Sequence, residues 1–395
     1  MIALDQKLEL LQNKLLNSEE PIKIMILGLG SVGLYLLDYL VSSGNPRVEI
    51  IVVGRNREKM TSDVNIIRTA ATIRRQYKAT IKIEGDCDFE DIDKIAAILD
   101  KWNPDFIINS SRVYSGLKYG SISWSTLRAY GIWTPLSVKF AKNIMMAYAK
   151  AGSNAITINT SYSDAVIPWL KSAGMAFFDF GSGNLNHLIP RMKFYIADKF
   201  GISDLNNIDV TLAVSHFHDV VISKEGHSEG QDILLDIKYN DKTLEYDKEE
   251  LLSACRIAMP VDQKRNMMNA SSNYDIINSI CTAITEHKKI KIHTPGVNGE
   301  IGGYPFIIDG TQSAKGYIDE SAFSIAEMRQ ANRDSIYLDG IANIEDGVLT
   351  YTLELLQKIE DSFQIKLQNK VDLPSYKILA DEIINGIIVP QTNNL

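Results

Sequence analysis

The sequence predicts an α/β protein in which a doubly wound parallel sheet is followed by a mixed α+β second domain. Short apolar runs alternate with helical patterns from Ile22 to Asn159, and this alternation is typical of a parallel sheet covered by helices on both faces. Beyond Asn159 the alternation is lost, and the runs 208–217 and 232–239 mix apolar with polar residues. These runs indicate an antiparallel sheet with helices to one side.

The elements of the first half follow from the apolar periodicity. Leucines at helical spacing predict an amphipathic helix over residues 3–17, packed on its own domain or on a partner subunit. No repeat or Pro-rich linker divides the chain, so the change of pattern alone predicts domains over residues 1–160 and 161–395. The remaining strands and helices of the first domain are expected at 22–27, 32–40, 48–53, 79–83, 92–99, 105–109, 136–149 and 155–159.

Composition excludes several classes of protein. The 395 residues are 45% hydrophobic and 23% charged, which argues against disorder. The formal net charge of −8 argues against a nucleic-acid-binding surface. The chain has three widely spaced cysteines, which are too few for a disulfide framework. It has no run of 18 apolar residues of the kind that spans a membrane. We therefore expect a cytoplasmic protein with no nucleic-acid or membrane partner.

A glycine motif follows the first expected strand. The run GLGSVG at residues 28–33 lies between the strand IKIMIL and a helix, and a second strand ends about 20 residues later. This context matches the dinucleotide-binding, Rossmann-like fingerprint, in which the glycines let a pyrophosphate approach a helix N-terminus. The alternative is a glycine turn that serves packing alone. The cofactor would contact Gly28, Gly30, Ser31, Val32 and Gly33.

The end of the second strand indicates which dinucleotide is bound. An NAD site places Asp or Glu there, against the ribose hydroxyls, whereas this chain has Arg55, Asn56 and Arg57. Arginine suits a ribose 2′-phosphate, so we expect NADP(H) rather than NAD. The alternative is that both arginines are ordinary solvated charges.

Two further loops follow strands of the same sheet. Asp86 follows the third strand and is expected near the adenine, while Ser110 follows the fourth and is expected near the nicotinamide. Arg112, in the same loop as Ser110, suggests a polar substrate. Each loop could equally be plain turn structure.

A pair of histidines is the strongest candidate for acid–base chemistry. His216 and His218 lie two residues apart at the expected end of a strand, which would put them on one face. Imidazole titrates near neutral pH, so one of them could exchange a proton with a hydroxyl or carbonyl group. Two alternatives remain: a zinc or iron site completed by Asp219, and plain surface histidines.

The central third of the chain resembles the lactate and malate dehydrogenases. The resemblance lies in the runs NTSYSDAVIPWLKSAG, GSGNLNHLIPRMKFYIADKFGI and VTLAVSHFHD, in that order and at similar spacing. It implies hydride transfer to or from nicotinamide, with substrate bound by a second domain that also forms dimers. It also implies that Asn159 contacts the ligands and that His216, or else His218, is the catalytic base.

The same helix departs from the family pattern. Asn186 and Ile189 stand where the family has the aspartate that orients the histidine and the arginine that binds a substrate carboxylate. Asn186 can still accept a hydrogen bond from imidazole, while Arg191 lies two residues too far along to replace the arginine on the same helical face. The resemblance thus implies a substrate other than a 2-hydroxy acid, such as another carbonyl or hydroxyl compound or an imine.

Two other functions fit the same scaffold. The run GNLNHL also resembles glycosidases that use NAD and a divalent metal, with His187 at the place of a metal-binding histidine. A non-catalytic dinucleotide sensor would account for the missing aspartate and arginine. The dehydrogenase hypothesis needs no metal, and it makes substrate contacts of His187, Arg191 and Arg112. Related folds imply that the protein is a homo-oligomer.

Overall fold

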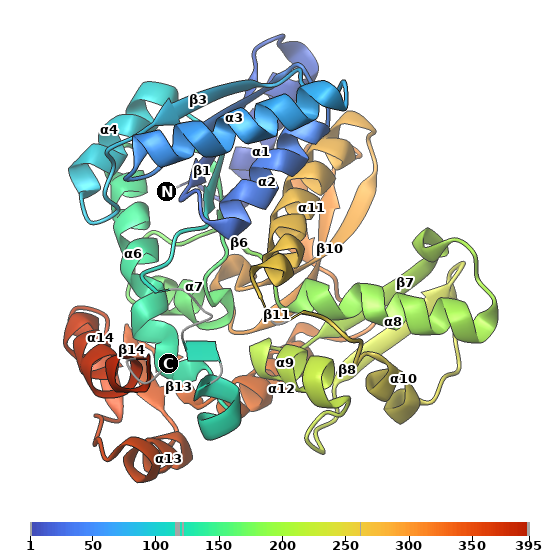
Figure 1. Ribbon diagram of the computed structural model, residues 1–395. Coiled ribbons are helices and arrows are strands. Elements are labelled where there is room, and N and C mark those ends of the chain that lie inside the picture. The colour runs from blue at the N-terminus through green and yellow to red at the C-terminus, as the bar shows by residue number, and fades with distance from the viewer. Residues whose placement is uncertain (1, 115–118, 121, 261, 393–395) are drawn as a thin grey trace.

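Six parallel strands form the central sheet (Figure 1), as the sequence predicts. The computed structural model describes residues 2–114, 119, 120, 122–260 and 262–392. The strand order is β3-β2-β1-β4-β5-β6. It reverses between β1 and β4, and ligands of such sheets bind at this switch point, beyond the carboxyl ends of the strands. The strands are β1 (Ile22–Leu27), β2 (Val48–Val53), β3 (Thr80–Glu84), β4 (Phe106–Asn109), β5 (Ile156–Asn159) and β6 (Phe180–Gly181).

Helices cover both faces of this sheet. Ile24 and Ile26 of β1 belong to one core, and Met25 and Leu27 to the other, since successive side chains of a strand point to opposite faces. One face is covered by α1 (Leu4–Asn17), α2 (Ser31–Ser42), α3 (Arg57–Ile73) and α11 (Asn266–Thr285). The other is covered by α4 (Ile92–Trp102), α6 (Thr134–Lys150) and α7 (Ser163–Ser172).

Segments from outside residues 22–159 complete the sheet. The sixth strand, β6, lies beyond residue 160, where the first domain is expected to end. Helix α1 packs against the same chain, because Leu8 and Leu11 are buried in its core. Lys7 of α1 is also buried, and its ammonium lies 2.8 Å from Asp179, next to β6.

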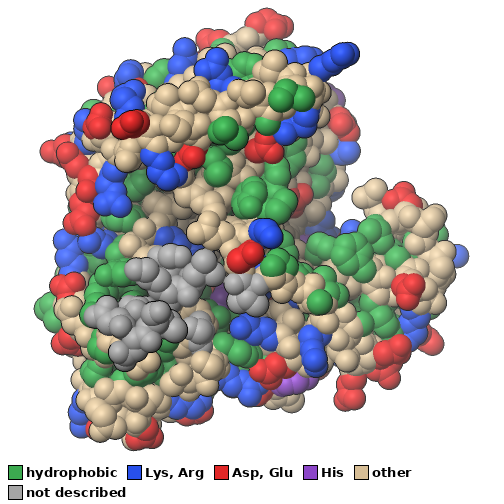
Figure 2. All heavy atoms as spheres, in the orientation of Figure 1, with side chains coloured by type: hydrophobic (Ala, Val, Ile, Leu, Met, Phe, Trp, Pro, Cys, Tyr) green, Lys and Arg blue, Asp and Glu red, His purple; other side chains and the backbone are tan. Residues whose placement is uncertain are grey.

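The second half of the chain adds three antiparallel sheets, so the mixed α+β part is confirmed. The sheet β7-β8-β9 forms, with α8, α9 and α10, a lobe that projects from the body (Figures 1 and 2). None of the described helices is long and apolar enough to span a bilayer. The strands are β7 (Ile208–Ala213), β8 (Leu234–Tyr239), β9 (Lys242–Thr243), β10 (Lys289–Pro295), β11 (Gly303–Asp309), β12 (Lys315–Ile318), β13 (Ile341–Glu345), β14 (Val348–Tyr351) and β15 (Lys370–Asp372). The remaining helices named below or drawn in Figure 1 are α8 (Leu185–Phe200), α9 (His216–Glu225), α10 (Lys248–Ala254), α12 (Ile325–Leu338), α13 (Leu353–Phe363), α14 (Tyr376–Ile383) and α15 (Val389–Thr392).

Candidate functional site

The glycine loop between β1 and α2 has the geometry of a phosphate cradle. Gly28 has φ +95°, which only glycine adopts without strain. A Cβ on Gly33 would lie 2.2 Å from the carbonyl oxygen of Gly28, so this position also requires glycine. A Cβ on Gly30, in contrast, would meet nothing within 4 Å. The loop therefore leaves open space over Gly30, at the N-terminus of α2, and a pyrophosphate fits there.

Neighbouring polar groups hold this loop in place. The Ser110 hydroxyl, just after β4, donates to the carbonyl oxygen of Gly28 at 2.6 Å. Ser31 accepts a hydrogen bond of 2.6 Å from the side-chain amide of Asn266, the first residue of α11, while Val32 is buried in the core. Asn266 lies 235 residues from Ser31, and no motif in the sequence points to it.

The end of β2 opens into a pocket of about 700 Å³ at the N-terminus of α3. Arg55 is exposed there, and Asn56 caps the helix by accepting the backbone N–H of Lys59. Arg57 Nε lies 3.6 Å from a carboxylate oxygen of Asp86, and both side chains of this ion pair are exposed to solvent. A helix N-terminus beside two guanidinium groups suits a phosphate.

His216 begins a helix instead of ending a strand. The expectation that His216 and His218 share a strand face is wrong, because β7 stops at Ala213 and both residues lie in the first turn of α9. The His216 backbone N–H donates to Asp164 of α7 at 3.0 Å. Since α7 directly follows β5, this bond places His216 at the carboxyl edge of the parallel sheet.

Asp339, at the end of α12, orients the His216 ring. Its carboxylate accepts a hydrogen bond of 2.9 Å from His216 Nδ1. The other ring nitrogen, Nε2, has no hydrogen-bond partner among the described residues, and 11% of the side chain remains exposed. Tyr130 and Tyr162 pack edge-on against the ring, with centroid separations of 4.5 and 5.2 Å. His216 can therefore exchange a proton through Nε2 while Asp339 fixes the tautomer.

Burial and the neighbouring carboxylates set the protonation of this group. Burial alone would lower the pKa of His216, but Asp339, with smaller effects of Asp164 and Asp219, outweighs it, and the pKa is raised above 6.5. Burial raises the pKa of Asp164 to about 6, against an opposing effect of His216. The pKa of Tyr162 is raised well above its usual value by burial and by Asp339, so this tyrosine stays neutral.

Replacing Asp164 with asparagine is expected to change how stability depends on pH. Because the folded pKa of Asp164 is about 6 against 3.8 unfolded, its stabilising contribution is complete below pH 3.8 and is lost as the pH rises through 6. The Asp164→Asn variant should therefore gain up to about 3 kcal/mol relative to the wild type between pH 4 and 7. Urea unfolding at several pH values measures this difference, and a constant difference would contradict it.

The other residues expected to meet ligands lie in different settings. His218 is buried, with Nδ1 2.6 Å from the Ser335 hydroxyl and Nε2 donating to a backbone carbonyl, and burial lowers its pKa. Asn186 donates to the Ser272 hydroxyl at 2.9 Å. Within the described chain it forms no hydrogen bond with His216, whose Nδ1 is bonded to Asp339 instead. Asn159 is fully buried at the end of β5 and bonded to Asn109 and the α7 turn, whereas Arg112 is exposed.

A second polar group lies one helical turn beyond His216. Asp219 of α9 has a carboxylate oxygen 3.7 Å from Nδ1 of His187, on α8. Arg191, one turn after His187, is buried and donates to the carbonyl oxygen of Cys255 at 3.2 Å. Burial lowers the pKa of Arg191, while Asp219 acts in the opposite direction. The residues expected to contact substrate on α8 thus face Asp219, which lies one helical turn beyond His216 on α9.

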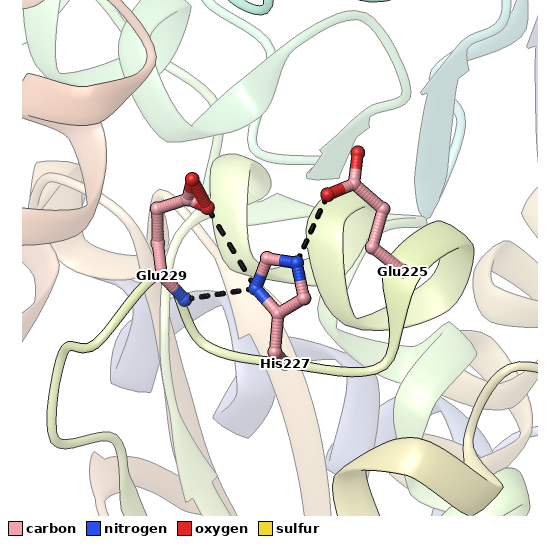
Figure 3. Close-up of side chains that lie close together, drawn as sticks. All are labelled: Glu225, His227 and Glu229. Carbon is pink, nitrogen blue, oxygen red and sulfur yellow. Dashed lines mark hydrogen bonds and ion pairs between the residues drawn. The ribbon is translucent and has the colours of Figure 1, made fainter.

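Metal-ligand spacing occurs elsewhere in the lobe. Within the described ranges, Glu225, His227 and Glu229 are the only group of three or more His, Cys, Asp or Glu residues whose ligand atoms lie within 4.8 Å of one another (Figure 3). Arg128 already pairs with both carboxylates, at 2.7 and 2.8 Å. A metal ion would have to displace this guanidinium, so the group is better described as an ion-pair network.

Comparison with known proteins identifies the fold. No protein-family model matches the chain, and no curated protein sequence does. Among solved structures, the malate dehydrogenase of Aeropyrum pernix matches at 14% identity and TM-score 0.52, over 80% of this chain and 97% of that one. The lactate dehydrogenase of Cryptosporidium parvum matches at 12% identity and TM-score 0.54, over 81% of this chain and 97% of that one. The malate dehydrogenase of Picrophilus torridus matches at 14% identity and TM-score 0.52, over 80% of this chain and 95% of that one. The chain therefore has the fold of the lactate and malate dehydrogenases, as the sequence resemblance implies.

Proposed function

We propose that the protein is an NADP(H)-dependent oxidoreductase that transfers hydride between nicotinamide and a small carbonyl, hydroxyl or imine substrate. The observation that carries this proposal is His216. It lies at the carboxyl edge of the sheet, with Nδ1 held by Asp339 and Nε2 free of hydrogen-bond partners within the described chain. A positioned imidazole with a free nitrogen is suited to general acid–base catalysis. The shared fold supports the proposal, since the Cryptosporidium enzyme is described in complex with lactic acid and nicotinamide adenine dinucleotide.

The cofactor would lie along the carboxyl edge of the sheet. Its pyrophosphate would lie over Gly30, where a Cβ would meet nothing within 4 Å. When bound, the dinucleotide supplies or accepts the hydride. The other residues proposed to hold it are Gly28, Ser31, Val32, Gly33, Arg55, Asn56, Asp86, Ser110 and Asn159.

Within the site, His216 would donate a proton to a substrate carbonyl or imine, or take one from a hydroxyl or amine. Asp339 would keep Nδ1 protonated, so that Nε2 is the atom that exchanges the proton. Tyr130 and Tyr162 would shield the pair from water, because their rings pack against His216 on two sides. His218, which has partners on both ring nitrogens, would support α9.

The Arg55→Ala variant is expected to bind NADPH about 10- to 100-fold more weakly than the wild type. A charge-assisted hydrogen bond to phosphate contributes about 1.5–3 kcal/mol. NADH affinity should change little, since the arginine would contact only the 2′-phosphate. Calorimetric titration with both nucleotides measures this, and Arg68→Ala, farther along α3, is the control. Equal losses for NADPH and NADH would contradict the NADP assignment, and failure of the wild type to bind either would remove the oxidoreductase proposal.

Assembly as a homo-oligomer and a cytoplasmic location stay predictions from the sequence.

A further inference from the structure

Helices α8 and α9 bring a cation, an anion and an imidazole together next to His216. His187 and Arg191 are four residues apart on α8 and so lie on one helical face, opposite Asp219. Asp219 follows His216 by three residues on α9 and is close enough to raise its pKa. The group therefore borders the proposed reaction centre.

Each of these side chains has a buried polar atom that lacks a partner. Among the described residues, eight buried side-chain nitrogen or oxygen atoms have no hydrogen-bond partner, and three of them are His187 Nε2, Arg191 Nε and Asp219 Oδ1. Arg191 is only 3% exposed and Asp219 5%. Leaving a buried polar group unsatisfied costs about 1–3 kcal/mol, and more if it is charged. These three residues lie on facing parts of α8 and α9, and buried polar groups are normally hydrogen-bonded, so the unpartnered atoms call for a partner outside the chain.

The unsatisfied atoms specify the chemistry of that ligand. Arg191 Nε is a hydrogen-bond donor and Asp219 Oδ1 is an acceptor. Within the described chain Asp219 is paired with His187 and not with Arg191. A ligand with only a carboxylate would leave Asp219 unsatisfied, and one with only an ammonium group would leave Arg191 unsatisfied. A molecule that carries both a carboxylate and an ammonium group offers a partner to each residue.

We propose that His187, Arg191 and Asp219 form a subsite for an amino-acid head group, with the substrate carboxylate on Arg191 Nε and its amino nitrogen on Asp219 Oδ1. Combined with the proposed function, on which it rests, this assigns the substrate to the amino acids and the imines derived from them. His187 Nε2 would add a hydrogen bond to the head group. Arg265, near enough to affect the pKa of both Tyr130 and Arg191, would contribute positive charge at the edge of the subsite.

Three small probes test this assignment. Glycine carries both groups of the head group, acetate only the carboxylate and methylammonium only the amine. The Arg191 Nε–H resonance of full-length protein labelled with ¹⁵N-arginine, assigned with Arg191→Lys, reports binding with and without NADP⁺. We expect glycine to bind at least about tenfold more tightly than acetate or methylammonium. In Asp219→Asn this preference should fall below about twofold, whereas Asp198→Asn, an exposed site on α8, should retain it.

The outcomes separate this inference from the proposed function. Equal affinity for acetate and glycine would overturn it in favour of a simple anion site. No response to any probe would also overturn it, since ordered water would then satisfy the three atoms. Titration of the same sample with NADP⁺ and NAD⁺ tests the oxidoreductase proposal independently. Nucleotide binding without a glycine preference overturns the subsite and leaves the oxidoreductase proposal in place. A glycine preference without binding of either nucleotide removes the oxidoreductase proposal and leaves an amino-acid-binding group.

Discussion

The Gly30→Ala variant is expected to lose at least about tenfold in affinity for NADPH while keeping its fold. Gly30 has extended backbone angles, φ −83° and ψ −166°, which alanine adopts freely, and its Cβ would meet no atom within 4 Å. Such a replacement stabilises a protein by about 0.4–1 kcal/mol, because it reduces the freedom of the unfolded chain. The new methyl group would nonetheless occupy the space over which the pyrophosphate must pass.

Gly33→Ala is the matched variant for this test, since it should fail for a different reason. Its Cβ would lie 2.2 Å from the Gly28 carbonyl oxygen and 2.9 Å from the Ser110 hydroxyl. Overpacking of this kind costs about 1–3 kcal/mol or more, so we expect a lower unfolding free energy together with weaker nucleotide binding. Urea unfolding and calorimetric titration of both variants separate the two effects. Wild-type NADPH affinity in Gly30→Ala would show that no pyrophosphate crosses this residue.

The parallel sheet could be predicted because its signals are local. The strand IKIMIL, the glycine loop and the following helix are adjacent in the sequence, and each pattern is complete within about 20 residues. Strands β1 and β2 are buried on both faces, so their apolar runs are nearly uninterrupted. The two-residue strand β6 pairs with β5, and helix α11 packs beside α2. Both join the first domain through tertiary contacts, and no local pattern indicates either of them.

The candidate site could be predicted only in part, because its partners are distant in sequence. His216 was found from its residue type and its place in the family pattern, but Asp339 lies 123 residues away. In the sequence, Asp339-Gly340 after a polar helix is an ordinary turn signal, and nothing there indicates that Asp339 is fully buried. Conversely, Asn186 occupies the expected helix, yet its amide bonds to Ser272 on α11, an element that the sequence does not place nearby.

The Asp339→Asn variant is expected to lower the pKa of His216 below 6.5 and to slow hydride transfer about 10²–10⁴-fold, the usual contribution of general acid–base catalysis. Without the carboxylate, burial becomes the dominant influence on His216 and disfavours its charged form. An asparagine amide that faces Nδ1 would also favour the tautomer with the proton on Nε2, which cannot accept a proton from substrate. NADPH affinity should stay unchanged, because Asp339 lies outside the glycine loop.

The same variant should be less stable than the wild type, by an amount that depends on pH. The raised pKa of His216 gives the wild type a stabilising contribution that is complete below about pH 6.5 and is lost as the pH rises through the folded-state pKa. The difference in unfolding free energy should therefore be largest near pH 5–6 and shrink at higher pH. Histidine ¹⁵N spectra measure the pKa and the tautomer, and Asp334→Asn, an exposed position on α12, is the control. An unchanged His216 pKa would mean that Asp339 does not set its protonation. A shifted pKa with unchanged turnover of an identified substrate would mean that His216 is not the group that exchanges a proton in the reaction.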